Sequence, residues 1–344
     1  MKKPFLSLAF ALTLTGFICG LAPQLAAAAD QPAPLKLVAH YTMPAEVKGR
    51  FDHLCADVTS NRLFLAAESA HEVLIFNLRS GKYVRAIPDI QIPHAIFVRD
   101  DINRIYVTDG GAGDLKIYDG KTYKLLKSAP LKVDADSIGY DPATKYLFID
   151  NGGGDAHEAF SMFSIVDTTT GDKIADIKLD GETLEAMALD SSSPRIYVNN
   201  RARNEVSVID RDAHSLVASW PVTMAKNNVA MALDNSTHRL FVACRSGAIV
   251  IFDTESGKEL HSFPIDTGVD DLVFDSASKR LYAAAGGMVD VYREVDADLF
   301  QSLGKIVSGP GGKNEVLVPA LHRLYITIPP GNNPPGSVAV FQVE

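Results

Sequence analysis

The sequence predicts an all-β protein, a seven-bladed β-propeller of four-stranded blades that is closed by an N-terminal strand completing the last blade. Three observations predict this fold: a short apolar segment that recurs seven times, an order of strands and turns that is constant between repeats, and a final repeat that is one strand short. The composition is that of a folded chain, because hydrophobic residues make up 47% and charged residues 22% of the 344 residues.

The recurring segment is an arginine, or in one copy a tyrosine, followed by three apolar residues. Its copies begin 41 to 49 residues apart, the period of blades that contain four strands. Two unrelated domains would not share one period, so we expect a single domain over residues 30–344. The seven copies are Arg62–Leu65, Arg104–Val107, Tyr146–Ile149, Arg195–Val198, Arg239–Val242, Arg280–Ala283 and Arg323–Ile326.

Each copy is expected to be the second strand of a blade, preceded by a first strand and a polar turn and followed by two more strands. Its successive apolar residues are typical of a strand whose two faces are both covered, here by neighbouring blades. The turn ahead of it contains an aspartate that can bind its own backbone. Arginine leads six of the seven copies, and this symmetry favours a structural partner in the turn or in a neighbouring blade over an anion site. The turn aspartates are Asp57, Asp141, Asp190, Asp234 and Asp275.

The last repeat decides how the ring closes. From Lys313 to Glu344 the chain has room for only three strands. Residues 35–41 form a strand-like segment ahead of the first full repeat, and they have no partner there. We expect this segment to pair beside residues 338–341, which would remove two exposed sheet edges.

The first 29 residues are expected to be a cleaved secretory signal. Lys2 and Lys3 precede an apolar run over residues 5–21, and four alanines, Ala26 to Ala29, offer a cleavage site near Ala29. No other apolar run reaches the roughly 20 residues that a membrane-spanning helix needs. The sequence therefore predicts a periplasmic or secreted protein without a membrane span.

The charge and the cysteines exclude several classes of protein. The full chain has a formal net charge of −9, and loss of Lys2 and Lys3 with the signal makes it −11, which disfavours a nucleic-acid partner. Only Cys55 and Cys244 remain in the mature chain, too few for a disulfide scaffold or a four-cysteine zinc site. Because they belong to different repeats, we expect two buried thiols.

Some repeats carry a more specific pattern. The segments Tyr106–Asp109 and Tyr197–Asn200, together with the turn Asp253–Lys258, resemble the YVTN repeats of bacterial YncE-like β-propellers. The resemblance covers residues 51–344 and implies the architecture. Several propeller families share such repeats, lactonases and surface-layer proteins among them, so the resemblance assigns no residue a role.

Polar residues at the start of the first strands are the main candidates for a functional site, because in propellers these strands line the central channel. One position, ten residues ahead of each copy, is occupied by Asp52, His94, Asp136, Glu185, Val229, Asp270 and Lys313. The next position adds His53, Ser137, Asp271 and Asn314, and strand alternation lets only one set face the axis. Carboxylates and an imidazole at one mouth could bind a divalent cation such as Ca²⁺, with Asp52, His94, Asp136, Glu185 and Asp270 as candidate ligands. The alternative is a solvated mouth that holds only water.

Two loops on the same face add candidate ligand-binding residues. The third repeat is the longest, and its extra residues include Asp155, His157 and Glu158, although an insertion without function is the alternative. Arg201 and Arg245, in adjacent repeats, would place a basic sector beside the acidic mouth. Such a sector could take a zwitterionic or carboxylate-bearing ligand.

Motifs that would identify an enzyme class are absent from the sequence. There is no Gly-x-Ser-x-Gly elbow, His-Glu-x-x-His helix, Cys-x-x-Cys-His attachment or phosphate loop. We therefore expect a non-catalytic binding or accessory module, a monomer, that holds a small molecule or a protein at its channel mouth and loop face. The alternative is a lactone or ester hydrolase in which a bound divalent cation activates water.

Overall fold

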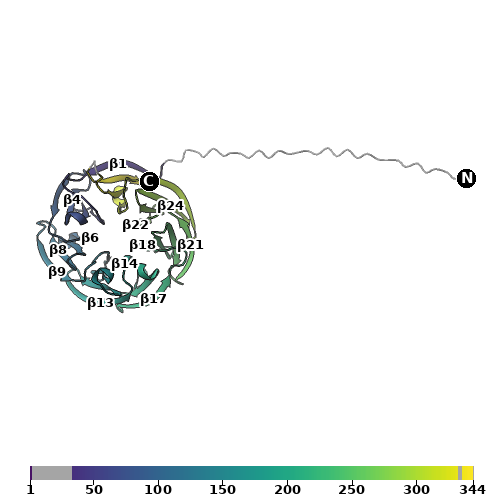
Figure 1. Cartoon of the computed structure of the whole chain (residues 1–344), viewed down its shortest axis with the longest axis horizontal. Helices are drawn as coiled ribbons and strands as arrows, with labels where there is room; N and C mark the ends of the chain where they lie inside the picture. The colour runs from purple at the N-terminus through teal and green to yellow at the C-terminus, as the bar shows by residue number, and fades with distance from the viewer. Residues whose placement is uncertain (2–32, 332–334, 344) are drawn as a thin grey trace. The chain divides into compact units, whose positions relative to one another are not determined.

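Seven four-stranded antiparallel sheets follow one another around a ring (Figure 1). The computed structural model describes residue 1, residues 33–331 and residues 335–343. The predicted signal peptide, residues 1–29, lies almost entirely outside the described residues. No helix among the described residues is long and apolar enough to cross a membrane.

Each blade runs from an inner first strand to an outer fourth strand. Blades 1 and 2 consist of β2 (Leu54–Asp57), β3 (Arg62–Ala67), β4 (Glu72–Asn77) and β5 (Tyr83–Ile87), then β6 (Pro93–Arg99), β7 (Arg104–Asp109), β8 (Asp114–Asp119) and β9 (Leu125–Pro130). Blades 3 and 4 consist of β10 (Ile138–Asp141), β11 (Tyr146–Gly152), β12 (Phe160–Asp167) and β13 (Asp172–Asp180), then β14 (Leu184–Leu189), β15 (Arg195–Asn200), β16 (Glu205–Asp210) and β17 (Ser215–Pro221).

The remaining three blades repeat this arrangement. Blades 5 and 6 consist of β18 (Asn228–Asp234), β19 (Arg239–Cys244), β20 (Ala248–Asp253) and β21 (Lys258–Pro264), then β22 (Val269–Asp275), β23 (Arg280–Ala285), β24 (Met288–Asp296) and β25 (Leu299–Val307). Blade 7 consists of β26 (Glu315–Val318), β27 (Arg323–Ile328), β28 (Ser337–Val343) and β1 (Leu35–Thr42). Short 3-10 turns occur at η1 (Glu68–Ala70), η2 (Asp100–Ile102), η3 (Gly153–Ala156), η4 (Arg201–Arg203) and η5 (Pro319–Leu321).

The predicted fold class is confirmed. All seven second strands begin at the arginine or tyrosine that leads the repeated segment. Their apolar residues are buried on successive positions, as in Leu63, Phe64 and Leu65 of β3, because each sheet packs between two neighbours.

The five turns that contain the aspartate have the expected chemistry, and in blades 2 and 7 the 3-10 turns η2 and η5 take their place. In blade 1, Asp57 Oδ1 accepts a hydrogen bond from the backbone N–H of Ser60 at 2.9 Å, and Arg62 Nη2 donates to Asp57 Oδ2 at 2.7 Å. In blade 4, Arg195 Nη1 instead donates to the carbonyl of Thr254 in the next blade at 2.7 Å. These bonds support a structural role for the repeated aspartates and arginines.

The N-terminal strand closes the ring, as predicted. β1 pairs antiparallel with β28, with Leu37 opposite Phe341 and Tyr41 opposite Val338 (Figure 1). The buried hydroxyl of Tyr41 also donates to the carbonyl of Leu78 at 2.8 Å, which fastens the closing strand to blade 1. The first strands consequently surround one channel, which positions the candidate site.

Candidate functional site

Breaks in the pairing of the first strands present polar side chains to the channel. Four of these strands have a register irregularity at the position ten residues ahead of the repeated segment, namely at His94, Glu185, Val229 and Asp270. In the other three blades this position, Asp52, Asp136 or Lys313, precedes the strand. Bulges and strand ends re-aim side chains, so the strict alternation expected from the sequence does not apply here.

All seven of these residues line one cavity of about 290 Å³ at the mouth of the channel. His53, Ser137 and Ala186, from the next position along, line it as well. Both sets therefore contribute, and every blade supplies at least one lining residue.

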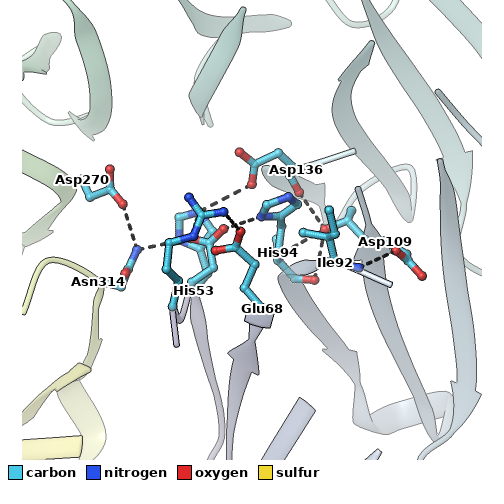
Figure 2. A network of polar contacts seen from close by, with 12 residues as sticks. His53, Glu68, Ile92, His94, Asp109, Asp136, Asp270 and Asn314 are labelled. Carbon is cyan, nitrogen blue, oxygen red and sulfur yellow. Dashed lines mark hydrogen bonds and ion pairs between the residues drawn. The ribbon is translucent and has the colours of Figure 1, made fainter. Parts of the chain in front are cut away.

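Asp52, His53, His94 and Asp136, from blades 1 to 3, form a polar network at one side of this cavity, and Asp271 of blade 6 contacts His53 from outside the cavity lining (Figure 2 shows His53, His94 and Asp136). His94 Nδ1 donates to Asp52 Oδ2 at 2.5 Å. His53 lies between three carboxylates. Its Nδ1 is 3.3 Å from Asp271 Oδ1. Its Nε2 is 3.7 Å from Asp52 Oδ1 and 3.9 Å from Asp136 Oδ1. Asn314 donates to Asp52 Oδ1 at 3.3 Å and to Asp270 Oδ2 at 3.2 Å, which joins this network to the opposite side of the channel.

The network shifts the pKa values of its members. Burial alone would raise the pKa of Asp52, but the charges of His53 and His94 hold it below its ordinary value. Burial alone would lower the pKa of His94, but Asp52 and Asp136 raise it to about 9. Burial and the charge of Asp52 raise the pKa of Asp136 to about 6 against the opposing histidines. At neutral pH, therefore, His94 is a cation beside an ionised Asp52.

The last two residues of β7, Thr108 and Asp109, fix the position of this network. Asp109, which is fully buried, accepts hydrogen bonds from the backbone N–H groups of Gln91 and Ile92, each at 2.9 Å, and so holds the segment that leads into His94. Thr108 Oγ1 donates to the carbonyl of Asp136 at 2.9 Å and accepts from the N–H of Ala95 at 2.8 Å. Blades 2 and 3 are thereby locked together at the mouth.

The predicted basic sector is neutralised by acids. Arg201 Nη1 lies 2.6 Å from Glu185 Oε1, while Arg245 and Lys313 both pair with Asp270. Of these, Arg201 is outside the lining of the cavity. A free anion-binding surface is therefore not formed here, which disfavours a carboxylate-bearing ligand.

The long loop of blade 3 contributes one of its three predicted residues. Asp155 lines the cavity. Glu158 turns away to Lys132, with Oε1 2.6 Å from Nζ, and His157 is an exposed residue that ends η3 with a φ of 58°. Neither His157 nor Glu158 lines the cavity.

Two polar residues that line the cavity, Asp134 and Arg50, were not among the site residues predicted from the sequence. Asp134 precedes the predicted position by two residues and enters the cavity from a turn with a φ of 62°. Arg50 pairs with Glu68 at the rim of the cavity. The one signal in the sequence is the spacing between these residues and the repeated segment. Because the loops differ in length from blade to blade, that spacing does not identify them.

Part of the predicted cation site is assembled. Within the described chain, Asp52, His94 and Asp136 form a group of potential metal ligands whose atoms lie within 4.8 Å of one another. As a cation, His94 would have to lose a proton before it could bind a metal, and because Nδ1 lies against Asp52, Nε2 is the nitrogen that would then serve as the ligand. The two other candidate ligands, Glu185 and Asp270, are already paired with arginine or lysine.

Comparisons with known proteins agree with the fold and leave the function open. No protein-family model matches the chain. The uncharacterized proteins YncE of Salmonella typhi and Salmonella typhimurium are each 27% identical to it over 99 residues, a stretch that spans 29% of this chain and only 28% of either relative. This local match and the seven blades support the resemblance to YncE-like propellers.

Solved structures extend the similarity over the whole ring. A chain of the hydrazine synthase of Kuenenia stuttgartiensis has a TM-score of 0.71 at 16% identity, and the similarity covers 88% of this chain and 99% of that one. A chain of a mitotic checkpoint complex has a TM-score of 0.74 at 13% identity, covering 96% and 99%. At such identities the likeness concerns the fold alone.

Proposed function

We propose that the protein is an exported, non-catalytic binding module that holds a small polar ligand at the mouth of its channel. The observation that carries this proposal is the cavity of about 290 Å³, which residues from every blade line and which contains both carboxylates and cationic side chains. Concave sites with a few convergent polar groups are the usual places for small ligands. A protein partner on the loop face is a less direct interpretation, because the polar residues converge inside the cavity.

Thermal unfolding in the presence of small molecules tests this proposal. The purified protein is heated with millimolar amines, carboxylates, sugars or amino acids, since a ligand that binds only the folded state must raise Tm. The half-buried Ile92 lines the cavity, so Ile92→Trp should fill the mouth and abolish any increase. The matched control is Ile174→Trp, on the exposed face of β13.

Binding at the mouth predicts a saturable increase in Tm in the wild type and in Ile174→Trp, and none in Ile92→Trp. If no compound raises Tm, or if Ile92→Trp responds as the wild type does, the proposal is wrong.

Export rests on the signal-like residues 1–29. Cell fractionation followed by N-terminal sequencing should find the protein outside the cytoplasm, beginning near Asp30. A cytoplasmic protein that retains Met1 would contradict export.

A divalent-cation-dependent hydrolase is the second candidate function, favoured by the group Asp52, His94 and Asp136. There a bound cation would polarise a lactone or ester carbonyl and activate water. Calorimetric titration with Ca²⁺, Mn²⁺ and Zn²⁺ tests it, together with a lactone hydrolysis assay on the wild type and on His94→Gln. Metal binding and hydrolysis that are both lost in His94→Gln would establish the hydrolase, whereas failure of all three metals to bind would eliminate it.

A further inference from the structure

A second cavity adjoins the channel mouth. It has a volume of about 210 Å³, and it shares His53, Ser137 and Ala186 with the mouth. Its other lining residues are all apolar and come from the first strands of blades 1 to 4, for example Leu54, Ile96 and Met187. The polar mouth thus adjoins an apolar chamber, and His53, Ser137 and Ala186 line both.

The negative charges of the mouth are distributed unevenly among the blades. Outside blade 3, every lining carboxylate has a cationic partner within 4.0 Å: Glu68 pairs with Arg50, Asp52 with the histidines, Glu185 with Arg201, and Asp270 with Arg245 and Lys313.

Blade 3 lacks this compensation. Among the described residues, no ion pair is formed by Asp134 or Asp155, and Asp136 has only the 3.9 Å contact to His53. Asp150, whose backbone carbonyl accepts a hydrogen bond from the Asp136 N–H at 3.1 Å, is 3% exposed, and its Oδ1 is buried without a hydrogen-bond partner in the described chain. The side of the cavity formed by blade 3 therefore has an excess of negative charge that a cation would relieve.

We propose that the ligand of this site is an organic ammonium ion with an apolar chain, which places its charged group among Asp134, Asp136 and Asp155 and its chain in the chamber beyond His53 (Figure 2 shows Asp136 and His53). This inference rests on the proposed function, and it names the class of ligand. An inorganic divalent cation would satisfy the carboxylates but would leave the apolar chamber unused. An anion with the same chain would meet the uncompensated carboxylates.

A series of probes separates these possibilities. Methylammonium, butylammonium, hexylammonium, hexanoate and Ca²⁺ are titrated into the purified protein by calorimetry. Affinity should rise along the ammonium series by roughly fourfold for each methylene group that enters the chamber. Hexanoate should bind at least tenfold more weakly than hexylammonium, since a charged group without a partner is costly to desolvate.

Two variants test the two ends of the ligand. Asp134→Asn combined with Asp155→Asn should weaken all ammonium probes by about tenfold or more, because charge-assisted hydrogen bonds are lost. Ala186→Leu should narrow the junction, so that hexylammonium binds no more tightly than methylammonium while methylammonium binding is retained. The controls are Asp212→Asn, at an exposed turn of blade 4, and Ala188→Leu, on the same strand as Ala186 but outside both cavities.

The outcomes distinguish this inference from the proposed function. If hexanoate binds at the mouth and no ammonium probe does, the proposed function stands and the ammonium ligand is wrong. If only Ca²⁺ binds, the ammonium ligand is wrong and the result favours the divalent-cation hydrolase. An affinity for the ammonium probes that does not depend on chain length would overturn the role of the chamber. If Asp212→Asn weakens ammonium binding as much as the double variant of Asp134 and Asp155 does, the role of the carboxylates is overturned. If nothing in the series binds, both the inference and the binding function lose their support.

Discussion

Glu315 provides a sharp test of the electrostatics around the channel. This residue begins β26, is 5% exposed, and has two buried carboxylate oxygens without a hydrogen-bond partner among the described residues. Its backbone N–H donates to Asp271 Oδ2 at 2.8 Å, so a second acid lies beside it. Burial and, to a lesser degree, Asp271 raise the pKa of Glu315 well above its ordinary value of 4.5.

The sign of the resulting pH dependence follows from linkage. Below pH 4.5 the carboxyl group is protonated in both the folded and the unfolded chain, so it does not make the free energy of unfolding depend on pH. Above pH 4.5 the unfolded chain releases the proton while the folded chain keeps it. The free energy of unfolding then falls by about 1.4 kcal/mol per pH unit, until the pH passes the folded pKa.

The perturbation is Glu315→Gln, which retains the shape of the neutral acid and does not titrate. Near pH 4.5 the variant and the wild type should unfold at similar urea concentrations. The variant should then become progressively more stable than the wild type as the pH rises, by about 1.4 kcal/mol per unit over the same window. Urea unfolding from pH 4.5 to pH 8 measures the difference.

The control is Glu255→Gln, at an exposed turn, which should show no such trend. A difference between Glu315→Gln and the wild type that does not change with pH would refute the buried neutral carboxyl. The result matters for the site, because a neutral Glu315 adds no negative charge to the channel and leaves blade 3 as the source of the excess.

Three further predictions concern the closure, the mouth and the thiols. Tyr41→Phe removes a buried 2.8 Å hydrogen bond from the closing strand and should lower the free energy of unfolding by about 0.5–1.5 kcal/mol in urea; no change would contradict its role in closure. A Cβ at Gly110 would lie 2.6 Å from the His94 ring, so Gly110→Ala should cost about 1–3 kcal/mol, while Gly154→Ala, with its nearest contact at 3.7 Å, should cost under about 0.5 kcal/mol. Equal costs would contradict the tight packing of that imidazole. Of the two thiols predicted to be buried, Cys244 is buried but Cys55 is only half-buried, because Cys55 lies on a first strand near the channel. Desolvation raises the pKa of both thiols to about 12, so Ellman's reagent at pH 8 should label neither in the folded protein and both in urea; rapid labelling of the folded protein would contradict the raised pKa values.

The fold could be predicted from the sequence because its determinants are local and repeated. An arginine or tyrosine before three apolar residues marks every second strand, and Asp57 and its equivalents mark the turns. The short last repeat left one strand missing, and only residues 35–41 could supply it, so the closure was also predictable.

The site could be predicted only in part, because it depends on irregularities in the repeat. Counting from the repeated segment found Asp52, His94 and Asp136, which the structure brings together. The same count could not predict that Glu185 and Asp270 lie at strand irregularities and form ion pairs with Arg201 and Arg245. Such pairs depend on side chains that meet across blades and leave no periodic signal in the sequence.

Asp134 illustrates the same limit. Asp134 lines the cavity with a left-handed backbone conformation, at a φ of 62°. No glycine next to it in the sequence indicates such a conformation. The apolar chamber was likewise hidden, because its lining residues resemble the core residues of any first strand.

The most direct test of the binding site is diffraction from crystals soaked with 6-bromohexylammonium, since the anomalous signal of bromine reports where the apolar end of the probe lies. A bound ligand should place its nitrogen within hydrogen-bond distance of Asp134 or Asp155 and its bromine in the chamber beside Ile96 and Met187. Bromine found only on the outer surface, or nitrogen bound away from blade 3, would contradict the proposed site.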